Sequence, residues 1–205
     1  MMTGASRAAR TAVRTRWGAG LGCLLAGGAL LLSSPSCARA DSTLGPLLKP
    51  LGLHEYPSRV VPPSLNGGTV DHQQLATRDL LGKVILVNFW ASWCRDCRPE
   101  MPVLERLHRE LGRQGFTVIG INAREARDVV HRYARELGLT FPLLLDPDGK
   151  LNTLYGVVGL PTTFILGRDG RAVGLAVGPR EWDSPSARAL LQALLAEPVP
   201  RPSAP

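Results

Sequence analysis

Two cysteines, Cys94 and Cys97, stand three residues apart in this chain of 205 residues. Two thiols at that spacing can close a disulfide or attack one in another molecule. An almost continuous apolar run, residues 84–90, precedes them, and apolar residues after them recur at helical spacing. We therefore expect Cys94 where a buried strand ends and a helix begins, with Cys97 one turn inside the helix. The partial positive charge of a helix N-terminus favours a thiolate over a thiol.

The two thiols are expected to play different parts. Cys94, nearer the N-terminus of the helix, is the predicted exposed nucleophile. Cys97 is predicted to be buried and to attack the mixed disulfide that Cys94 forms. The alternative is a structural disulfide, but so short a loop restricts the unfolded chain little and would stabilise the fold weakly. The other cysteines, Cys23 and Cys37, lie in the N-terminal segment, so no disulfide-stapled scaffold is expected.

A carboxylate follows the pair at helical spacing. Glu100 comes three residues after Cys97, so both should lie on one helix face. Val103 and Leu104 share that face, which should therefore turn toward the sheet. Burial would raise the pKa of Glu100 and suit it to carry a proton for Cys97. The alternative is an exposed acid that complements the helix dipole. The helix should run to about residue 114 with a kink at Pro102.

The N-terminus has the pattern of a secretory signal. Residues 1–40 contain five of the 24 basic residues and no acid, which leaves 19 basic against 17 acidic residues in the remainder. An apolar stretch, residues 18–32, precedes a small-x-small site, so we expect cleavage before Asp41. An uncleaved anchor is an alternative, although the stretch is shorter than the roughly 20 residues that span a bilayer. Lipidation at Cys37 is another. With no basic run interleaved with aromatic residues, nucleic acid is excluded as a partner.

The remaining chain indicates one α/β domain. We interpret residues 41–59 as a tether, residues 60–196 as the domain and residues 197–205 as a disordered, proline-rich tail. The order strand, helix, strand within residues 84–121 predicts two parallel strands. A turn at residues 168–170 predicts an antiparallel hairpin before a C-terminal helix. The expected architecture is a central mixed β-sheet flanked by helices.

The region around the cysteines resembles a known family. Residues 89–102, with Cys-x-x-Cys and a proline five positions later, resemble the thioredoxin active-site segment. Asn88, Glu100 and the run of residues 159–164 resemble the TlpA/ResA/DsbE branch of the thioredoxin superfamily. The resemblance covers about residues 60–195. It implies a thioredoxin-like fold and an exported, often membrane-tethered reductase, and many members of that branch act in cytochrome c maturation.

The resemblance also implies a substrate-binding set. Pro161 should be a cis-proline that faces the disulfide, although only about 5–6% of X–Pro bonds are cis. The backbone of Leu160 could then pair with an extended substrate segment. Thr162 belongs to the same site and stands where the cytochrome-dedicated DsbE members tend to carry glutamate. Trp93 is either a platform for the partner protein or a lid on the core, and we favour the platform.

The predicted function is an exported, periplasmic thiol–disulfide oxidoreductase that reduces disulfide-bearing proteins. It would need an upstream electron donor, such as a membrane thiol transporter, and no cofactor or metal. A disulfide-forming oxidant is an alternative, disfavoured by the lack of a histidine between the cysteines. A copper chaperone is another, since two thiolates suit Cu(I), but the nearby Met101 and His108 are better explained by the helix. A peroxidase ranks last. We interpret all four histidines as surface residues, because no metal-ligand spacing relates them (His54, His72, His108 and His131).

Overall fold

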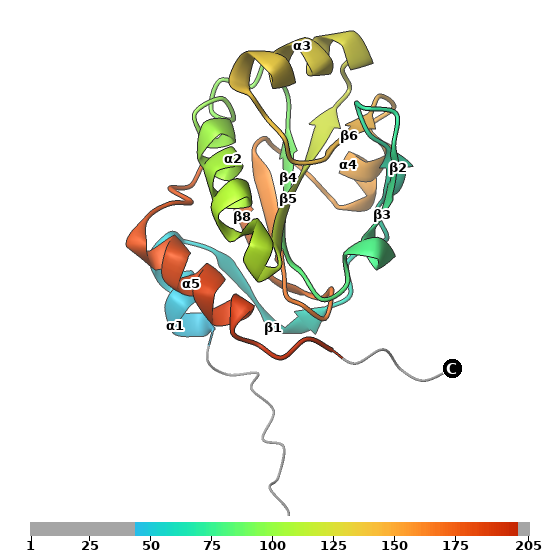
Figure 1. The fold of residues 1–205 in the computed structure, drawn as a ribbon. Coiled ribbons are helices and arrows are strands. Elements are labelled where there is room, and N and C mark those ends of the chain that lie inside the picture. Colours follow the sequence, from blue (N-terminus) through green and yellow to red (C-terminus); the bar gives the residue numbers. More distant parts are fainter. Residues whose placement is uncertain (1–43, 201–205) are drawn as a thin grey trace, which may run out of the picture. The chain divides into compact units, whose positions relative to one another are not determined.

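A mixed sheet lies at the centre of residues 44–200, the part of the chain that this computed structural model describes. Its strand order is β1-β8-β7-β4-β5-β6 (Figure 1). The strands are β1 (His54–Val60), β4 (Val84–Trp90), β5 (Phe116–Ala123), β6 (Leu143–Asp146), β7 (Thr162–Leu166) and β8 (Ala172–Val177). Strands β4, β5 and β6 are parallel, whereas β7, β8 and β1 pair antiparallel. The predicted mixed sheet, parallel unit and C-terminal hairpin are confirmed.

Four helices contribute to the core on one face of this sheet. The α-helices are α1 (Gly45–Leu48), α2 (Glu100–Leu111), α3 (Arg127–Leu137), α4 (Lys150–Leu154) and α5 (Pro185–Leu195). Side chains of α1, α2, α3 and α5 share one hydrophobic core. On the other face, α4 lies near a small hairpin of β2 (Asn66–Gly68) and β3 (Gln74–Ala76) (Figure 1). Short 3₁₀ turns complete the fold as η1 (Lys49–Leu51), η2 (Thr77–Leu80) and η3 (Gly112–Gln114).

Strand β4 is buried along its whole length and contributes to both cores. Leu86 and Trp90 belong to the core beneath the four helices, whereas Val87 and Phe89 belong to the core on the opposite face. This alternation follows from the two-residue period of a strand. It places Asn88 on the same face as Leu86 and Trp90, toward the helices. Strand β4 therefore places the polar side chain of Asn88 on the face that the four helices cover.

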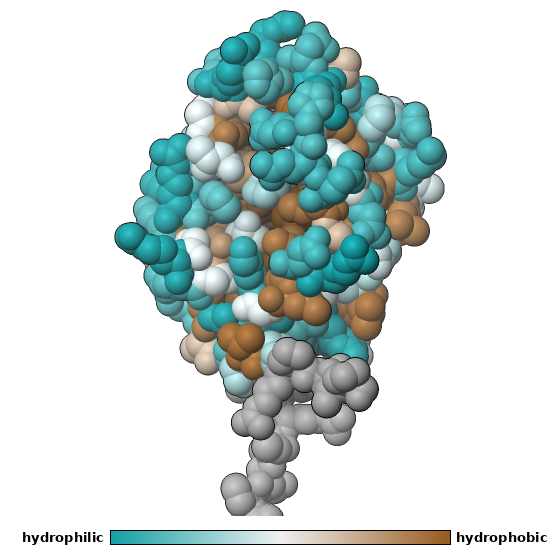
Figure 2. Space-filling model, turned by 45° about the vertical axis from the view of Figure 1, so that its right-hand side comes forward, coloured by the Kyte–Doolittle hydropathy of each residue, from teal (hydrophilic) through white to brown (hydrophobic). Residues whose placement is uncertain are grey.

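The described surface is mainly hydrophilic on the side of α4 and the β2–β3 hairpin, with hydrophobic residues gathered toward the middle of the view (Figure 2). Exposed apolar side chains are ordinary on the surface of a folded domain. No helix within residues 44–200 has both the length and the apolar character needed to cross a membrane.

The tether predicted for residues 41–59 is wrong where the structure describes it. Residues 45–51 form α1 and η1, and residues 54–60 form β1, which pairs with β8 at the sheet edge. Leu48 has 1% of its surface exposed and packs into the core with α5. An edge strand is largely exposed and tolerates proline, here Pro57, so its sequence lacks the apolar period of a central strand. The domain therefore begins well before residue 60.

The helix after the cysteines also starts later than predicted. Residues 91–99 form turns, in which the Cys97 N–H donates to Cys94 O at 3.2 Å and the Glu100 N–H donates to Cys97 O at 3.1 Å. Pro99 is the N-cap of α2. Pro102 is its third residue, where the missing N–H breaks no intrahelical bond, so the reason for the expected kink disappears. The helix ends at Leu111 and continues as η3 to residue 114, near the predicted end.

The predicted tail begins with an ordered contact. The Glu197 carboxylate pairs with the guanidinium of Arg59 on β1, so residue 197 belongs to the folded domain. Residues 201–205 lie outside the described part of the chain, as do the predicted signal segment, its cleavage site and Cys37.

Candidate active site

The cysteine pair lies directly after β4 and is joined as a disulfide, with the two Cα atoms 5.3 Å apart. Cys94 retains 6% of its surface exposed and lines a pocket, whereas Cys97 has 0% exposed. Cys94 is thus buried and not exposed as predicted, but of the two cysteines it is the one that lines this pocket. The Cys97 N–H lies 3.2 Å from Cys94 Sγ. Because α2 starts only at Glu100, this turn N–H supplies the local donor that sequence reasoning had assigned to the end of the helix.

Glu125, which sequence reasoning missed, holds the segment that leads from β4 to the cysteines. Its carboxylate accepts hydrogen bonds from the Ser92 N–H at 2.7 Å and from the Asn122 side-chain amide at 2.7 Å. The Ser92 hydroxyl donates to the other carboxylate oxygen. Asn122 lies opposite Trp90 in the parallel pair of β4 and β5. Polar residues at the carboxyl ends of adjacent parallel strands were the signal that could have indicated this contact.

We expect Glu125→Gln to destabilise the fold by about 1–2 kcal/mol, because one amide oxygen cannot replace two carboxylate oxygens that accept three donors. The loop before Cys94 should loosen as well. Glu136→Gln is the matched control, since Glu136 makes an exposed ion pair with Arg98 that contributes little. Urea unfolding of both variants measures the difference, and equal losses of stability would contradict the assigned role of Glu125.

The loop before β7 has the predicted cis peptide bond between Leu160 and Pro161. Pro161 O accepts a hydrogen bond from the Gly178 N–H at 2.8 Å. Thr162 has 2% of its surface exposed, and its hydroxyl donates to Gly159 O at 2.7 Å. The Thr162 side chain is therefore buried against the loop, where its hydroxyl stabilises the backbone. It is not exposed for contact with a substrate, contrary to its predicted place in the substrate-binding set.

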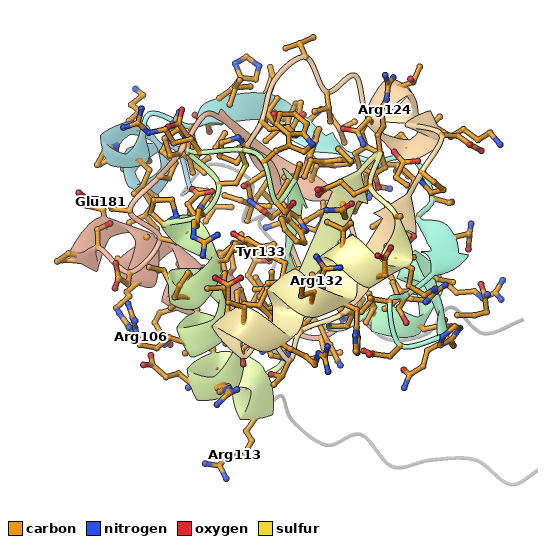
Figure 3. All side chains as sticks on the ribbon, turned by 90° about the horizontal axis from the view of Figure 1, so that it is seen from above. Arg106, Arg113, Arg124, Arg132, Tyr133 and Glu181 are labelled. Atoms are coloured by element: carbon orange, nitrogen blue, oxygen red, sulfur yellow. A yellow bond between two sulfur atoms is a disulfide. The ribbon has the colours of Figure 1, made fainter. Side chains whose placement is uncertain are left out.

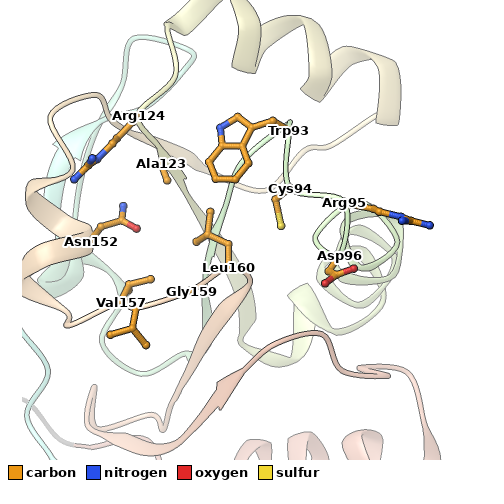
Figure 4. Close-up of a pocket in the computed structure, with 11 residues that line it drawn as sticks. Trp93, Cys94, Arg95, Asp96, Ala123, Arg124, Asn152, Val157, Gly159 and Leu160 are labelled. Carbon is orange, nitrogen blue, oxygen red and sulfur yellow. The ribbon is translucent and has the colours of Figure 1, made fainter.

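A pocket of about 520 Å³ opens beside Cys94 (Figure 4). It is lined by Trp93, Cys94, Arg95, Asp96, Ala123, Arg124, Asn152, Val157, Val158, Gly159 and Leu160. The structure thus brings together three predicted residues, Trp93, Cys94 and Leu160. With 69% of its surface exposed, Trp93 lies beside the pocket and is not a lid on the core. The wall from residues 152 to 158 was missed, because no local pattern relates it to the cysteines.

Glu100 is buried beneath the segment that joins β8 to α5. It has 4% of its surface exposed, which confirms the predicted burial. Its Oε1 accepts hydrogen bonds from the Arg180 N–H at 2.7 Å and from the Trp182 indole N–H at 2.9 Å. Among the described residues, Oε2 has no hydrogen-bond partner. The two donors lie about eighty residues away in sequence, and no motif indicated them.

Burial raises the pKa of Glu100 to about 7, against the opposing effects of the Arg180 N–H, the Trp182 indole, the Asn88 amide and the Arg180 charge. The Asn88 amide, which carries two N–H donors, also donates to Thr163 Oγ1 at 2.9 Å. A carboxyl group that titrates near neutral pH can both accept and return a proton. The predicted direction of the pKa shift therefore agrees with the geometry.

The sequence pattern of the AhpC/TSA family matches residues 59–173, more than half of the chain. The chain belongs to the AhpC/TSA family. The thiol-disulfide oxidoreductase ResA of Bacillus subtilis is 32% identical over 106 residues, which cover 52% of this chain and 59% of ResA. The match thus spans less than two thirds of that relative.

Solved structures agree with this AhpC/TSA assignment. A thiol:disulfide interchange protein of the thioredoxin family from Chlorobium tepidum superimposes with a TM-score of 0.62 at 28% identity, covering 69% of this chain and 99% of that chain. A secreted thiol-disulfide isomerase from Corynebacterium glutamicum gives a TM-score of 0.62 at 28% identity, covering 71% and 91%. The thioredoxin-like fold and the resemblance to the ResA and DsbE branch are confirmed.

One histidine of this AhpC/TSA chain departs from the prediction. His54, His72 and His131 are exposed, as expected. His108 is half-buried, and its Nδ1 accepts a hydrogen bond from the Val118 N–H at 3.4 Å. Burial lowers the pKa of His108, which favours the neutral imidazole. Within residues 44–200, no group of three or more His, Cys, Asp or Glu side chains is arranged to hold a metal ion.

Proposed function

We propose that this protein is a thiol–disulfide oxidoreductase that reduces disulfides in protein substrates. The observation that carries the proposal is the Cys94–Cys97 disulfide, in which Cys94 faces a pocket and Cys97 is enclosed. A purely structural disulfide would not need one sulfur beside a pocket and the other enclosed. The names of relatives such as ResA support the same activity.

The reaction begins with the reduced pair. The Cys94 thiolate attacks one sulfur of a substrate disulfide, that S–S bond breaks, and the departing substrate sulfur takes a proton. Cys97 then loses its proton to the Glu100 carboxylate and attacks Cys94 Sγ. This step releases the second substrate thiol and leaves the Cys94–Cys97 disulfide. Two electrons have moved to the substrate, and an upstream dithiol must return them.

The pocket beside Cys94 suits an extended, partly apolar substrate segment. Trp93 and Val158, with 69% and 90% of their surfaces exposed, line this pocket and offer apolar contact to such a segment. The backbone of Leu160, next to the cis-proline, can pair with the main chain of such a segment. This mode of binding leaves the substrate sequence largely free and places its disulfide over Cys94.

We also infer export to the periplasm. The proposal rests on the basic, apolar and small-residue pattern of residues 1–40, and the secreted isomerase that superimposes on the domain supports it. A retained N-terminal segment would tether the domain to the membrane. In that compartment a membrane thiol transporter is the proposed electron donor, and proteins of cytochrome c maturation are proposed substrates.

We expect a reduction potential of about −200 to −270 mV, the range of glutaredoxins and thioredoxin. The residues between the cysteines, Arg95 and Asp96, are exposed and of opposite charge, so neither thiolate gains a strong net stabilisation. Equilibration with glutathione buffers, read by the fraction of free thiol, measures the potential. A value near about −120 mV would instead assign the protein to the disulfide-forming oxidants.

A further inference from the structure

Both donors to Glu100 come from one loop, residues 178–183, between β8 and α5. The Arg180 N–H and the Trp182 indole N–H converge on Oε1, while Oε2 is buried without a partner among residues 44–200. The two carboxylate oxygens therefore have different surroundings, although nothing in the chemistry of a free carboxylate distinguishes them.

The loop is held firmly at several points. The Arg180 guanidinium donates to Leu51 O at 2.8 Å and to Gly52 O at 3.1 Å, at the C-terminal end of η1. The Gly178 N–H donates to Pro161 O at 2.8 Å, which links the loop to the cis-proline. The Trp182 side chain has 1% of its surface exposed. The positions of the two donors are thus set by the burial of the Trp182 side chain and by hydrogen bonds from the loop to the backbone of Leu51, Gly52 and Pro161.

Two N–H donors on one oxygen decide where a proton can reside. In a protonated carboxyl group the carbonyl oxygen is the good acceptor, and the hydroxyl oxygen is a donor. Oε1 accepts two hydrogen bonds, so it suits the carbonyl role. The hydroxyl role then belongs to Oε2, which makes no hydrogen bond to a described group and is therefore the oxygen left open to exchange a proton with a reacting group.

We propose that Trp182 is a positioning residue for proton transfer, which together with the Arg180 N–H holds Oε1 of Glu100 as the accepting oxygen, so that Oε2 carries the proton exchanged with Cys97. The exchange with Cys97 rests on the function proposed above. The role of Trp182 in fixing and tuning the carboxyl group does not depend on that function.

Other charged groups lie near Glu100 and also influence its pKa. A pocket of about 420 Å³ borders Glu100 and is lined by Asp96, Pro99, Glu100, Val103, Pro179, Arg180, Glu181 and Asp183. Two titratable groups, Asp96 and Cys97, precede α2. The loop contributes Arg180, Glu181 and Asp183. Strand β4 contributes only the neutral Asn88. Glu181 lies on the α5 side of α2, away from Arg124 near α4 (Figure 3). A change at Trp182 leaves all these charges in place.

Trp182→Phe removes one donor to Oε1 and keeps an aromatic ring. The charged carboxylate loses more than the neutral acid, so the pKa of Glu100 should rise by about one unit. The measurement is a carboxyl ¹³C NMR titration of glutamate-labelled full-length protein with both cysteines reduced. Trp90→Phe is the matched control, because Trp90 is equally buried but its indole N–H has no partner among the described residues. An equal shift in both variants, or none in Trp182→Phe, would overturn the proposal.

The kinetic test uses the pH profile of the step in which Cys97 resolves a mixed disulfide. Its inflection should move upward by the same amount in Trp182→Phe, and the substitution should have no further effect on the profile in a Glu100→Gln background. A second shift in that background would show that Trp182 acts otherwise. Absence of any disulfide reduction by the wild-type protein would reject the proposed function but leave the titration result standing.

If Trp182→Phe fails to fold, Arg180→Lys tests the same claim. It keeps the positive charge but lacks the planar guanidinium that bonds both Leu51 O and Gly52 O, so it loosens the loop and weakens both donors to Glu100. The pKa of Glu100 should again rise. An unchanged or lowered value would contradict the proposal.

Discussion

Replacing Cys97 with alanine will stop the reaction at a covalent mixed disulfide between Cys94 and the substrate. Cys94 lines the pocket and keeps its attack, but the buried thiol that would break the new bond is gone. Replacing Cys94 with alanine will abolish both turnover and trapping, because Cys97 has 0% of its surface exposed and cannot reach a substrate sulfur. The two variants should therefore differ qualitatively, although the two side chains are chemically identical.

Non-reducing mass spectrometry with a disulfide-bearing test protein measures the trapped species. The double variant Cys94→Ala/Cys97→Ala is the control for adventitious thiol chemistry. Equal trapping by Cys94→Ala and Cys97→Ala would contradict the assignment of Cys94 as the nucleophile. Trapping from a periplasmic extract with Cys97→Ala would then identify the natural partner.

Replacing Glu100 with glutamine should slow the resolving attack of Cys97 by about a hundredfold, within the range typical of a lost general base. The neutral amide also removes a negative charge near Cys97, so the thiolate forms more easily, the reduced state gains stability and the potential becomes less negative. Single-turnover rates, thiol titrations and the potential of wild type and variant measure these effects. If all three stay unchanged, Glu100 takes no part in proton transfer.

The same substitution should stabilise the fold at alkaline pH. The pKa of Glu100 rises from its ordinary value of 4.5 to about 7 on folding, so the folded state binds more protons than the unfolded state between those pH values. The free energy of unfolding therefore falls as the pH rises through them. Above about pH 7 the wild-type protein carries a buried charge that the glutamine lacks. Glu100→Gln should then be more stable than wild type by up to about 3 kcal/mol, with almost no difference near pH 4.

Glu105 is the matched control for this pH dependence. It is another buried acid on α2, with 6% of its surface exposed. Burial alone would raise its pKa, but hydrogen bonds from Thr140 and the pairing with Arg109 outweigh burial and lower it. Its contribution to stability is therefore present above its unfolded pKa and lost in acid, so Glu105→Gln should destabilise the fold at neutral pH. Unfolding curves that move in the same direction for both variants would contradict these assignments.

Local patterns in the sequence predicted the elements that carry the chemistry. Strand β4 and the body of helix α2 were predicted because a buried strand and an amphipathic helix each repeat their apolar residues within a few positions. Cys94, Cys97 and the buried Glu100 followed from spacing along one such stretch. These features depend on neighbours in sequence, which is why one chain suffices to find them.

Local sequence patterns did not predict the N-terminal elements or the residue at which α2 begins. Strand β1 lies at an edge, so its exposed side chains show no apolar period, and its position is set only by pairing with β8 far along the chain. The helix begins at Glu100 because residues 91–99 close a series of turns behind β4. Propensity alone does not distinguish those turns from the first turn of a helix.

Tertiary structure alone decided the surroundings of the reacting groups. Glu125 reaches back to Ser92, and Trp182 and Arg180 reach Glu100 from segments about eighty residues away. The sequence by itself determined that a thiol pair and a nearby carboxyl group would lie at the end of a buried strand. Which oxygen of that carboxyl group is held, and how strongly its proton is bound, was decided by the fold, because burial and hydrogen bonding depend on every segment that packs against it.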